Sequence, residues 1–573
     1  MKQIIKVYLF LTCVIICLND LAGQNNDLNL QPNCPKEKFE IILSQESAFT
    51  NEIIWFKIYC VSSLFPDDIS SIAFIELVSS ENTAIIRKKV LLKHGEGKGE
   101  FEIPHNLPTG LYYILSYTNW MKNFGETTFC RKELIIVNPD QPPVNTPDSL
   151  EYMKSKVESI NTPVNDNKLK ITSDKKKYST RDKVSIKIKT ESLSGKAISG
   201  DFSVSVSRKE PEMIFNTGRS REAVLTTEPE RTIYLPDYKG IRLSGTLKDS
   251  TGNAVSGAFV NASMPGPGTD IKSNITDSKG IFNFILNPQE AEQDIVILLP
   301  DHESRISLEE SFWNGFRNPP DNLSFRFNSD AVAYLQEKYA HFQLQNRFNK
   351  QYALRNPPFK SMADSSVFYE KPYPLIELSN YIRLDSLREY FYELVPSVKF
   401  TQRRGEFEIS VLDPVTKTPL EKKPGVFLDG VLYDNFSAIA NIPVGEIDRM
   451  AVLPNTYYYK DFTFGGIIDI HTKKSDFNSV KPLPNMTRFI FPMPNPGEWR
   501  FSPPDYSVAD SISRIPDFRY LLLWEPDMRI DNSGEVTIHF YTGDIYGSFV
   551  VKVVGITDEG KFLKAESEIL IKD

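Results

Sequence analysis

The stretch Ile53-Ile54-Trp55-Phe56-Lys57-Ile58-Tyr59-Cys60 consists almost entirely of β-branched and aromatic residues, which pack well on a pleated sheet. Comparable runs follow at Ser71–Val78 and Leu111–Tyr117, and glycine-rich turns such as His94–Gly99 separate them. Several short strands divided by glycine and proline turns are typical of a β-sandwich. We therefore expect a first sandwich over residues 35–138.

Alternation of polar and apolar residues, the pattern of a half-buried strand, recurs in two distant regions. Asp182–Lys189 shows it and predicts a second sandwich over residues 169–239. Val536–Tyr541 shows it again, close to the end of the chain. There we expect a separate C-terminal β-strand unit over residues 515–573.

Segments with other patterns connect these regions. Residues 139–168 contain several prolines among Asn, Asp and Ser, which predicts an exposed linker. Residues 240–308 contain polar-glycine turns such as Asp249–Asn253, which predict a small β-module. Residues 329–400 contain apolar residues at helical spacing and the cap residue Ser386, which predict a helical connector with two helices.

The region 405–475 combines strand patterns with a short helical stretch, so we expect an α+β domain there. Asp429-Gly430 should form a tight turn between two strands, since glycine adopts backbone angles that other residues resist. Gly465-Gly466 should mark the beginning of the last strand of this domain, Ile467–Thr472.

The first residues predict export. Lys2 and Lys6 precede the apolar run Val7–Cys17, and the small-residue pattern Leu21–Gly23 follows, so residues 1–23 are predicted to be a secretory signal peptide. A retained anchor is the alternative, but the apolar run is too short to span a bilayer as a helix. We expect an exported protein without a direct membrane span. It would lie in the periplasm, associated with the outer membrane or on the cell surface.

Charge and cysteine content limit the classes of partner. A formal net charge of -8 argues against nucleic acid as a partner. The densest basic run, Lys175–Lys177, is expected to be a solvated strand edge. Beyond the predicted signal lie Cys34, Cys60 and Cys130; the last two could pair in an oxidising compartment, or both could be small buried hydrophobic residues.

Motifs for catalysis are missing from the sequence. The six histidines are scattered and lack metal-ligand spacing, and there is neither a Gly-x-Ser-x-Gly elbow nor a Walker-type phosphate loop. We therefore expect no enzyme activity, no catalytic residues, no cofactor and no metal.

One sequence string resembles a known family. Leu115–Gly125 reads Leu-Ser-Tyr-Thr-Asn-Trp-Met-Lys-Asn-Phe-Gly and resembles the signature of macroglobulin-like (MG2) domain proteins of Bacteroidota. Asn51–Lys57 and Asp174–Val184 resemble further segments of the same family, the second more loosely. In all these strings the aromatic residues are expected to fill sandwich cores. Asn119 and Asn123 are expected to fix a turn.

Two other regions carry resemblances of their own. Residues 241–286 resemble a carboxypeptidase-regulatory-like β-module, and residues 424–474 resemble the plug domain of TonB-dependent outer-membrane receptors. A receptor barrel of about 22 strands needs several hundred residues, whereas only about a hundred residues follow Lys474. The sequence also lacks the Gly-Cys-Gly-Glu-Gln thioester motif. The outer surface of the plug-like domain should therefore face water or another protein.

Together these features predict a mostly β, multi-domain protein. Its parts would be tandem macroglobulin/Ig-like β-sandwiches, the small β-module, the α+β plug-like domain and a C-terminal β unit. We expect a non-enzymatic binding or scaffold protein that works with an outer-membrane uptake or assembly complex. The candidate partner-binding residues are Tyr457, Tyr458 and Phe462, provided that they are not part of a core. The alternative function is a macroglobulin-like periplasmic protease decoy without a thioester.

Overall fold

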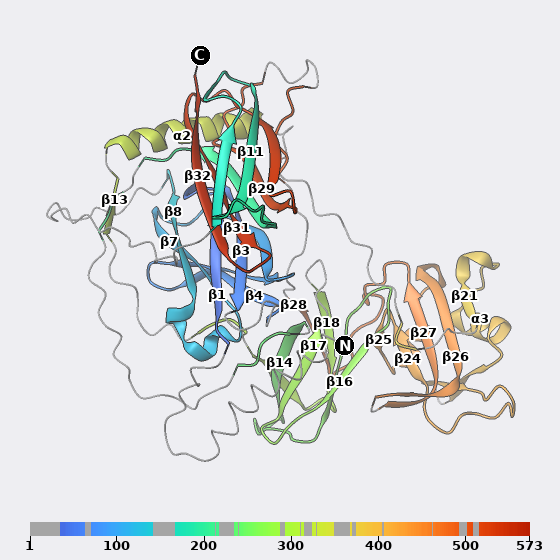
Figure 1. Cartoon of the computed structure of the whole chain (residues 1–573). Helices are drawn as coiled ribbons and strands as arrows, with labels where there is room; N and C mark the ends of the chain where they lie inside the picture. Colours follow the sequence, from blue (N-terminus) through green and yellow to red (C-terminus); the bar gives the residue numbers. More distant parts are fainter. Residues whose placement is uncertain are drawn as a thin grey trace, which may run out of the picture. The chain divides into compact units, whose positions relative to one another are not determined.

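A computed structural model gives the architecture, and the chain forms two compact units (Figure 1). Unit 1 comprises Met1–Tyr238, Phe312–Pro358 and Glu498–Asp573, and unit 2 comprises Lys239–Ser311 and Phe359–Gly497. The structure describes residues 35–62, 70–140, 167–211, 214–216, 234–238, 240–286, 293–309, 311–314, 324–327, 329–348, 367–369, 374–403, 406–460, 462–491, 501–507 and 515–572. Most described residues are in strands, which confirms the predicted mostly β, multi-domain class. The predicted signal peptide and nearly all of the predicted linker lie outside the described residues.

Unit 1 begins with a β-sandwich. One sheet has the order β1 (Glu37–Leu43), β3 (Ile53–Ser62), β6 (Glu96–Glu102). The other has the order β2 (Ser47–Phe49), β8 (Cys130–Val137), β7 (Gly110–Tyr117), β4 (Ile72–Ser79), β5 (Ala84–Leu91). Alternating side chains of both sheets are fully buried between them, among them Phe56, Phe74 and Ile114.

A second sandwich combines two distant parts of the chain. Its larger sheet has the order β10 (Lys177–Tyr178), β32 (Phe562–Ile571), β31 (Gly547–Thr557), β12 (Gly200–Arg208), β29 (Leu521–Ile530). Its smaller sheet has the order β30 (Glu535–Tyr541), β11 (Lys183–Ser192), β9 (Asn167–Ser173).

This strand order corrects the expectation that residues 169–239 and 515–573 form separate units. β12 lies between β29 and β31, and β11 pairs with β30, so neither segment completes a sheet by itself. Alternation of polar and apolar residues specifies which face of a strand is buried, but it does not specify which strand is its neighbour.

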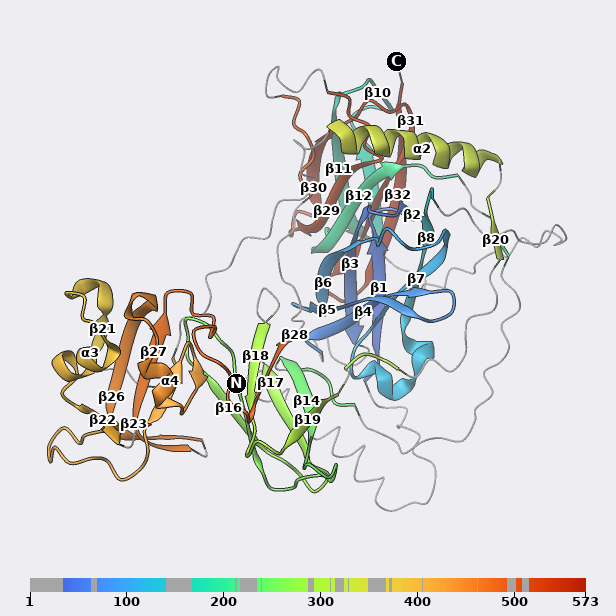
Figure 2. The same cartoon turned by 180° about the vertical axis from the view of Figure 1, so that it is seen from behind.

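The two sandwiches of unit 1 pack against each other and against helix α2 (Ser329–Phe348). Trp55 and Tyr59 of β3 share an apolar cluster with Trp524 of β29. Ala331 and Leu335 of α2 belong to a core cluster that contains residues of both sandwiches. Figure 2 shows α2 lying across the end of the second sandwich. The helix therefore joins the two sandwiches from one side.

Buried polar groups also hold α2 in place. The side chain of Lys338 is almost fully buried, and its Nζ donates to Ser47 O at 2.9 Å and to Ser47 Oγ at 3.2 Å. Within unit 1, a short pair of strands, β13 (Ile214–Asn216) and β20 (Ser324–Arg326), completes the described sheet structure.

Unit 2 contains two halves. The β-module half has one sheet of order β17 (Ile281–Leu286), β14 (Ile241–Lys248), β19 (Arg305–Leu308). Its other sheet has the order β16 (Ile271–Ile275), β15 (Phe259–Ser263), β18 (Gln293–Leu298), β28 (Met486–Phe491). Strand β28 comes from beyond residue 475, so the module takes its last strand from the far end of unit 2.

The α+β half is built on a five-stranded sheet. Its order is β21 (Leu375–Glu377), β26 (Ile447–Tyr459), β27 (Phe462–Thr472), β24 (Gly425–Leu428), β25 (Val431–Leu432). This half also contains two helices, α3 (Leu387–Leu394) and α4 (Phe436–Ala440), and the hairpin of β22 (Val398–Arg403) and β23 (Glu406–Val411). Tyr390 and Phe391 of α3 are buried in the core of this half. The predicted helical connector is therefore divided, because α2 belongs to unit 1 and α3 to unit 2. Among the described residues, no helix is both long and apolar enough to cross a membrane.

Glycines fix two turns of the α+β sheet. Asp429 and Gly430 have φ angles of 49° and 82° and join β24 to β25 as a two-residue turn, which confirms the prediction. The Gly465-Gly466 pair lies inside β27 instead of at its beginning, because the strand already starts at Phe462. A register shift opposite this pair shows a β-bulge, and a Cβ on Gly465 would lie 1.8 Å from Lys422 O.

Candidate interaction site

The three predicted partner-binding residues lie on the hairpin formed by β26 and β27. Tyr459 pairs with Phe462 and Tyr458 pairs with Thr463, so successive residues point to opposite faces of the hairpin. The side chain of Tyr458 is 75% exposed, whereas Tyr457 and Phe462 are partly buried. The structure therefore separates Tyr458 from the other two candidates.

The buried face of the hairpin packs on a short segment, residues 367–369. The ring of Tyr459 lies 4.4 Å from that of Phe368, and Tyr457 Oη donates to Phe368 O at 3.2 Å. Phe462 stacks on Phe464, with 5.2 Å between ring centroids. The expected patch of aromatic side chains is thus reduced, on this hairpin, to Tyr458.

A strap from the β-module half covers the same face of the sheet; we define the strap as residues 264–271. Gly266 N donates to Asp429 O at 3.0 Å, and Phe368 N donates to Thr269 O at 3.0 Å. Lys460 Nζ donates to Ile271 O at 3.3 Å. Part of the outer surface of the α+β half, expected to face water or another protein, is instead covered by the chain's own strap.

Beneath the strap lies a buried group of polar side chains. Asp469 Oδ2 accepts from Thr269 Oγ1 at 2.7 Å and from Tyr369 Oη at 2.6 Å. His471 Nε2 lies 3.2 Å from Asp469 Oδ1, although the geometry is not that of a hydrogen bond. Burial, followed by the charge of Asp469, raises the pKa of Tyr369 far above its usual value.

This polar group has the residue types of a catalytic site but not the access. Asp469 and His471 are each at most 2% exposed, so a substrate could not reach them in this conformation. Asp429 is also fully buried, and it accepts from Thr472 N at 2.6 Å and from Phe477 N at 3.0 Å. These carboxylates hold strand ends and the strap in place.

In unit 1, the string Leu115–Gly125 forms the end of β7 and the 3-10 helix η1 (Met121–Phe124). Tyr117 Oη donates to Glu76, and Arg87 Nε donates to the other oxygen of the same carboxylate at 3.0 Å. The Glu76 side chain is fully buried. Burial raises its pKa, and the bonds from Tyr117 and Arg87 only partly offset that effect.

The buried Lys122 lies in an aromatic cage. Its Nζ is 4.5 Å from the ring centroid of Phe74, 5.3 Å from that of Tyr234 and 5.7 Å from that of Tyr117. Asn119 Oδ1 accepts from the same Nζ at 2.9 Å. Cation–π contacts and the amide oxygen together compensate for removing the ammonium group from water.

The same string holds the two chain segments that flank residues 239–311. Asn123 Nδ2 donates to Tyr234 O at 2.7 Å, and Tyr234 N donates to Asn123 Oδ1 at 2.8 Å. Trp313 N donates to Tyr117 Oη at 2.8 Å. Asn123 also bonds Trp120 O at 2.9 Å, which is the predicted turn, but its contact with Tyr234 has no local sequence signal. The string therefore acts as a clamp on both segments.

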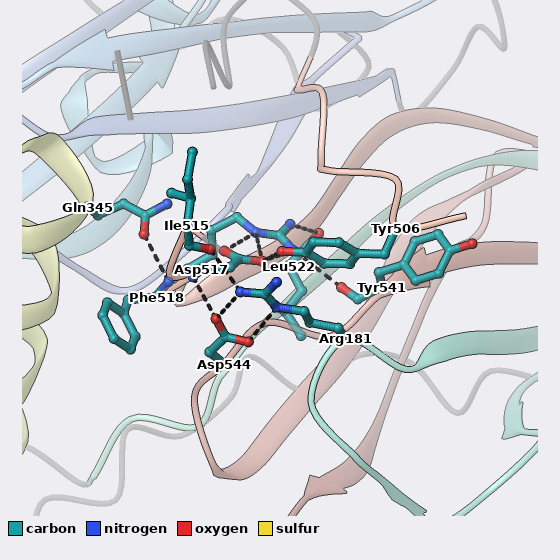
Figure 3. A network of polar contacts seen from close by, with 10 residues as sticks. Arg181, Gln345, Tyr506, Ile515, Asp517, Phe518, Leu522, Tyr541 and Asp544 are labelled. Atoms are coloured by element: carbon teal, nitrogen blue, oxygen red, sulfur yellow. Dashed lines mark hydrogen bonds and ion pairs between the residues drawn. The ribbon is translucent and has the colours of Figure 1, made fainter. Parts of the chain in front are cut away.

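A second anchor holds the chain just before β29, and Figure 3 shows its contacts. Arg181 donates to both carboxylate oxygens of Asp544, at 2.8 and 2.7 Å, and to Ile515 O at 2.8 Å. The nearly buried Arg519 donates to both oxygens of Asp517, and Tyr506 Oη donates to Asp517 Oδ2 at 2.7 Å.

The network also reaches α2, because Phe518 N donates to Gln345 Oε1 at 2.9 Å (Figure 3). Burial alone would raise the pKa of Asp544, but the hydrogen bonds and charge of Arg181 outweigh it and hold that pKa below its usual value. No sequence pattern marks these residues as a site, since they are isolated polar or charged residues far apart in the chain.

The two described cysteines do not form a disulfide bond with each other. Cys60 lies on β3 and Cys130 on β8, which belong to different sheets of the first sandwich. Burial raises the pKa of the Cys130 thiol to about 12. Of the two alternatives left open by the sequence, the structure argues against the disulfide, although both cysteines are only half-buried.

Comparisons with known proteins give only distant likenesses. No protein-family model matches the chain, and no curated protein matches it significantly. The resemblances to MG2, carboxypeptidase-regulatory-like and plug domains therefore stay predictions.

Among solved structures, the chain is similar to Escherichia coli alpha-2-macroglobulin activated by porcine elastase, with 9% identity, a TM-score of 0.24, and coverage of 94% of this chain and 44% of that one. For the native conformation of E. coli alpha-2-macroglobulin, the identity is 10% and the TM-score 0.23, with coverage of 94% of this chain and 40% of that one. For the Yersinia pseudotuberculosis adhesin InvE, the identity is 8% and the TM-score 0.13, with coverage of 47% of this chain and 57% of that one. The chain thus spans less than half the length of the macroglobulin structures, and TM-scores this low support no conclusion about its function.

Proposed function

We propose that the chain is a non-enzymatic binding or scaffold protein of the bacterial cell envelope, associated with an outer-membrane uptake or assembly complex. In this proposal, unit 2 carries the surface that binds the partner, and unit 1 fixes the chain segments that lead to unit 2 and back. The export expected from residues 1–23 fits a periplasmic or outer-membrane-associated location.

The observation that carries the proposal is the distribution of exposed apolar side chains. Most of the large apolar side chains that are exposed among the described residues belong to unit 2, although unit 2 is the smaller unit. A contiguous patch of exposed apolar surface often marks a protein contact, and in this proposal the exposed side chains of unit 2 supply that surface. The most exposed of these side chains are Ile382, Val415, Tyr392, Tyr458 and Ile490.

The polar contacts of unit 1 support this role. Asn123 and Tyr117 hold the segments on both sides of residues 239–311, and the Arg519–Asp517 pair lies where the chain returns from unit 2. Buried polar networks of this kind fix backbone positions, because breaking one leaves unpaired groups away from water. These polar contacts thus fix, within unit 1, the segments where the chain leaves for unit 2 and returns from it.

Affinity capture tests the proposal. The full-length tagged protein would be incubated with gently solubilised outer membranes, and co-purifying proteins would be identified by mass spectrometry. We expect Tyr458→Ser to reduce recovery of a specific outer-membrane protein. Tyr546→Ser removes an exposed tyrosine from unit 1 and should leave recovery unchanged. Equal recovery with a folded Tyr458→Ser variant would remove Tyr458 from the site, and no enrichment by the wild type would contradict the scaffold role.

The protease-decoy alternative predicts a different result. Incubation with an endoprotease would leave the protease bound, active on a small peptide substrate and shielded from protein substrates. Cleavage without retention of the protease would exclude the decoy function.

A further inference from the structure

We infer that the outer face of the sheet β30–β11–β9 in unit 1 is a docking surface for an anionic lipid surface. It is a lysine-rich face with an exposed leucine at its end. This inference is independent of the proposed protein partner and concerns a different unit of the chain.

The strand register places the lysines of this face side by side. In β11, Val184, Ile186 and Ile188 are fully buried, so the residues between them point outward. Lys189 lies opposite Lys170 of β9 and opposite Glu535 of β30. The outward residues of the face are Lys168, Lys170 and Thr172 on β9; Lys183, Ser185, Lys187, Lys189 and Glu191 on β11; and Glu535, Thr537, His539 and Tyr541 on β30.

Carboxylates neutralise only part of this face. Lys187 pairs with Glu535 at 2.8 Å, and Lys189 pairs with Glu191 at 2.9 Å. The other three lysines of the face are Lys168, Lys170 and Lys183. Within the described part of the chain none of these three forms an ion pair, so the face carries a net positive charge.

The segment that follows β9 adds further lysines. Lys175 and Lys176 are exposed in the connection to β10, and Lys177 is exposed as the first residue of β10 in the larger sheet. Among the described residues only Lys175 has an ion-pair partner, Asp182 at 2.9 Å. Outward side chains repeat about every 7 Å along a strand, and neighbouring strands are about 5 Å apart. The lysines therefore form a two-dimensional array of charges instead of a line.

The overall charge of the chain does not account for this arrangement. The formal net charge of the chain is -8, whereas the outward residues of this face include five lysines and only two glutamates. Lys170 and Lys189 are directly opposite each other, and like charges in that position destabilise a sheet. Keeping these lysines together on one face therefore costs stability. Such a cost is expected where the lysines bind an anionic partner.

The residue after β11 indicates which anionic partner fits. Leu193 is 61% exposed and lies in a tight turn, in which Ser192 N donates to Lys196 O at 2.8 Å. Lys196 is exposed in the same turn. An apolar side chain beside a basic surface suits a bilayer, because it enters the headgroup region while lysines contact the phosphates. A soluble polyanion offers no apolar region that Leu193 could enter.

Vesicle flotation with the full-length protein tests the inference. The wild type should bind vesicles in which about a third of the lipid is phosphatidylglycerol and should not bind pure phosphatidylcholine. High salt should weaken binding, since it screens exposed charges. The variant Lys168→Ser/Lys170→Ser/Lys183→Ser should bind roughly 100-fold more weakly, if each lysine near an anionic surface contributes about 1 kcal/mol.

A matched control separates position from total charge. Lys209→Ser/Lys561→Ser/Lys564→Ser removes three exposed lysines elsewhere in unit 1, and it should bind like the wild type. Leu193→Ser should bind more weakly than the wild type, most clearly at high salt. Equal thermal unfolding of all variants would show that they are folded.

Three results would overturn the inference. They are equal binding of the wild type to neutral and anionic vesicles, wild-type binding by the Lys168/Lys170/Lys183 variant, and unchanged binding by Leu193→Ser. Dextran sulfate provides a further arm. If it binds with the same lysine dependence while vesicles do not bind, the partner is a soluble polyanion and the lipid assignment is wrong.

Discussion

The side-chain amide of Asn123 pairs with both backbone groups of Tyr234, donating to its carbonyl at 2.7 Å and accepting from its N–H at 2.8 Å. The two residues are 111 positions apart in the chain. An amide can form this pair because it has a donor and an acceptor side by side. No other side-chain type of similar size offers both in that geometry.

Replacing Asn123 should loosen the segment 234–238. Asn123→Ala leaves the N–H and C=O of Tyr234 without these partners, which should lower the free energy of unfolding of unit 1 by about 2 kcal/mol. Hydrogen exchange should become faster at the Tyr234 amide. Asn532→Ala, at an exposed turn of unit 1, is the control and should change neither quantity. Unchanged exchange at Tyr234 would contradict the clamp.

Asp544 should make the stability of unit 1 depend on pH. Its pKa is held below the usual aspartate value, so its charged form stabilises the fold at neutral pH, and that contribution is lost as pH falls through the lowered pKa. Asp544→Asn should cost about 2 kcal/mol at pH near 7 and almost nothing at the lowest pH where both proteins fold. Urea unfolding across this range measures the difference. The exposed Asp140→Asn is the control and should match the wild type throughout.

Gly430 should tolerate a methyl group less well than another glycine with a similar backbone. Gly430 and Gly252 have φ angles of 82° and 89°, so alanine is strained at both. A Cβ at residue 430 would lie 2.5 Å from Gly268 O in the strap, whereas nothing lies within 4 Å at residue 252. Gly252→Ala should cost about 1 kcal/mol and Gly430→Ala clearly more, measured by thermal unfolding. Equal costs would show that the strap is not seated on this turn.

Replacing Tyr458 and replacing Tyr459, neighbours on the β26–β27 hairpin, should have different effects on the stability of unit 2. Tyr459 packs on Phe368, and its Oη donates to Asp270 at 3.3 Å, so Tyr459→Ser should destabilise unit 2 by about 2 kcal/mol. Tyr458→Ser removes an exposed side chain and should change stability by less than about 0.5 kcal/mol. Chemical denaturation of both variants checks this. A large loss with Tyr458→Ser would mean that its ring is also part of a core.

The Cys130 thiol should react slowly in the folded protein. With its pKa raised to about 12, only roughly 1 in 10,000 molecules carries the thiolate at pH 8. Iodoacetamide at that pH should leave Cys130 unmodified in the native protein and should modify it after denaturation without a reductant. Protection that persists in denaturant and disappears with a reductant would instead indicate a disulfide.

Local patterns in the sequence predicted local structure correctly. The Asp429-Gly430 turn follows from residue chemistry, because two successive positive φ angles favour Asp-Gly in a two-residue hairpin loop. The buried face of β11 follows from the alternation within Asp182–Lys189. Both features depend only on residues within a few positions of one another.

The sequence patterns did not predict which strands pair when they are far apart in the chain. The expectation of a separate unit over residues 515–573 was wrong because every strand of the second sandwich alternates in the same way, whatever its neighbour is. Asn123 shows that the same holds for side-chain contacts. The sequence predicted its turn, which the bond to Trp120 O confirms, but not its contact with the distant Tyr234.

The candidate site was only partly predictable. Alternation along a strand already implies that Tyr457 and Tyr458 point to opposite faces. It does not reveal that the strap and residues 367–369 cover one of those faces. Whether Tyr458 contacts a partner stays a prediction.

The assembly of the second sandwich from distant segments has a consequence for the order of synthesis. Ser185 of β11 and His539 of β30 are hydrogen-bonded but 354 residues apart, so β11 is made long before its neighbour exists. Domains tend to fold as soon as they are complete, and bringing distant strands together costs chain entropy and time. Unit 2, which ends at Gly497, is therefore complete before the second sandwich can close. A premature stop after residue 520 should yield a chain with a finished unit 2 and with β11 and β12 unpaired on one side, a species exposed to proteolysis and aggregation.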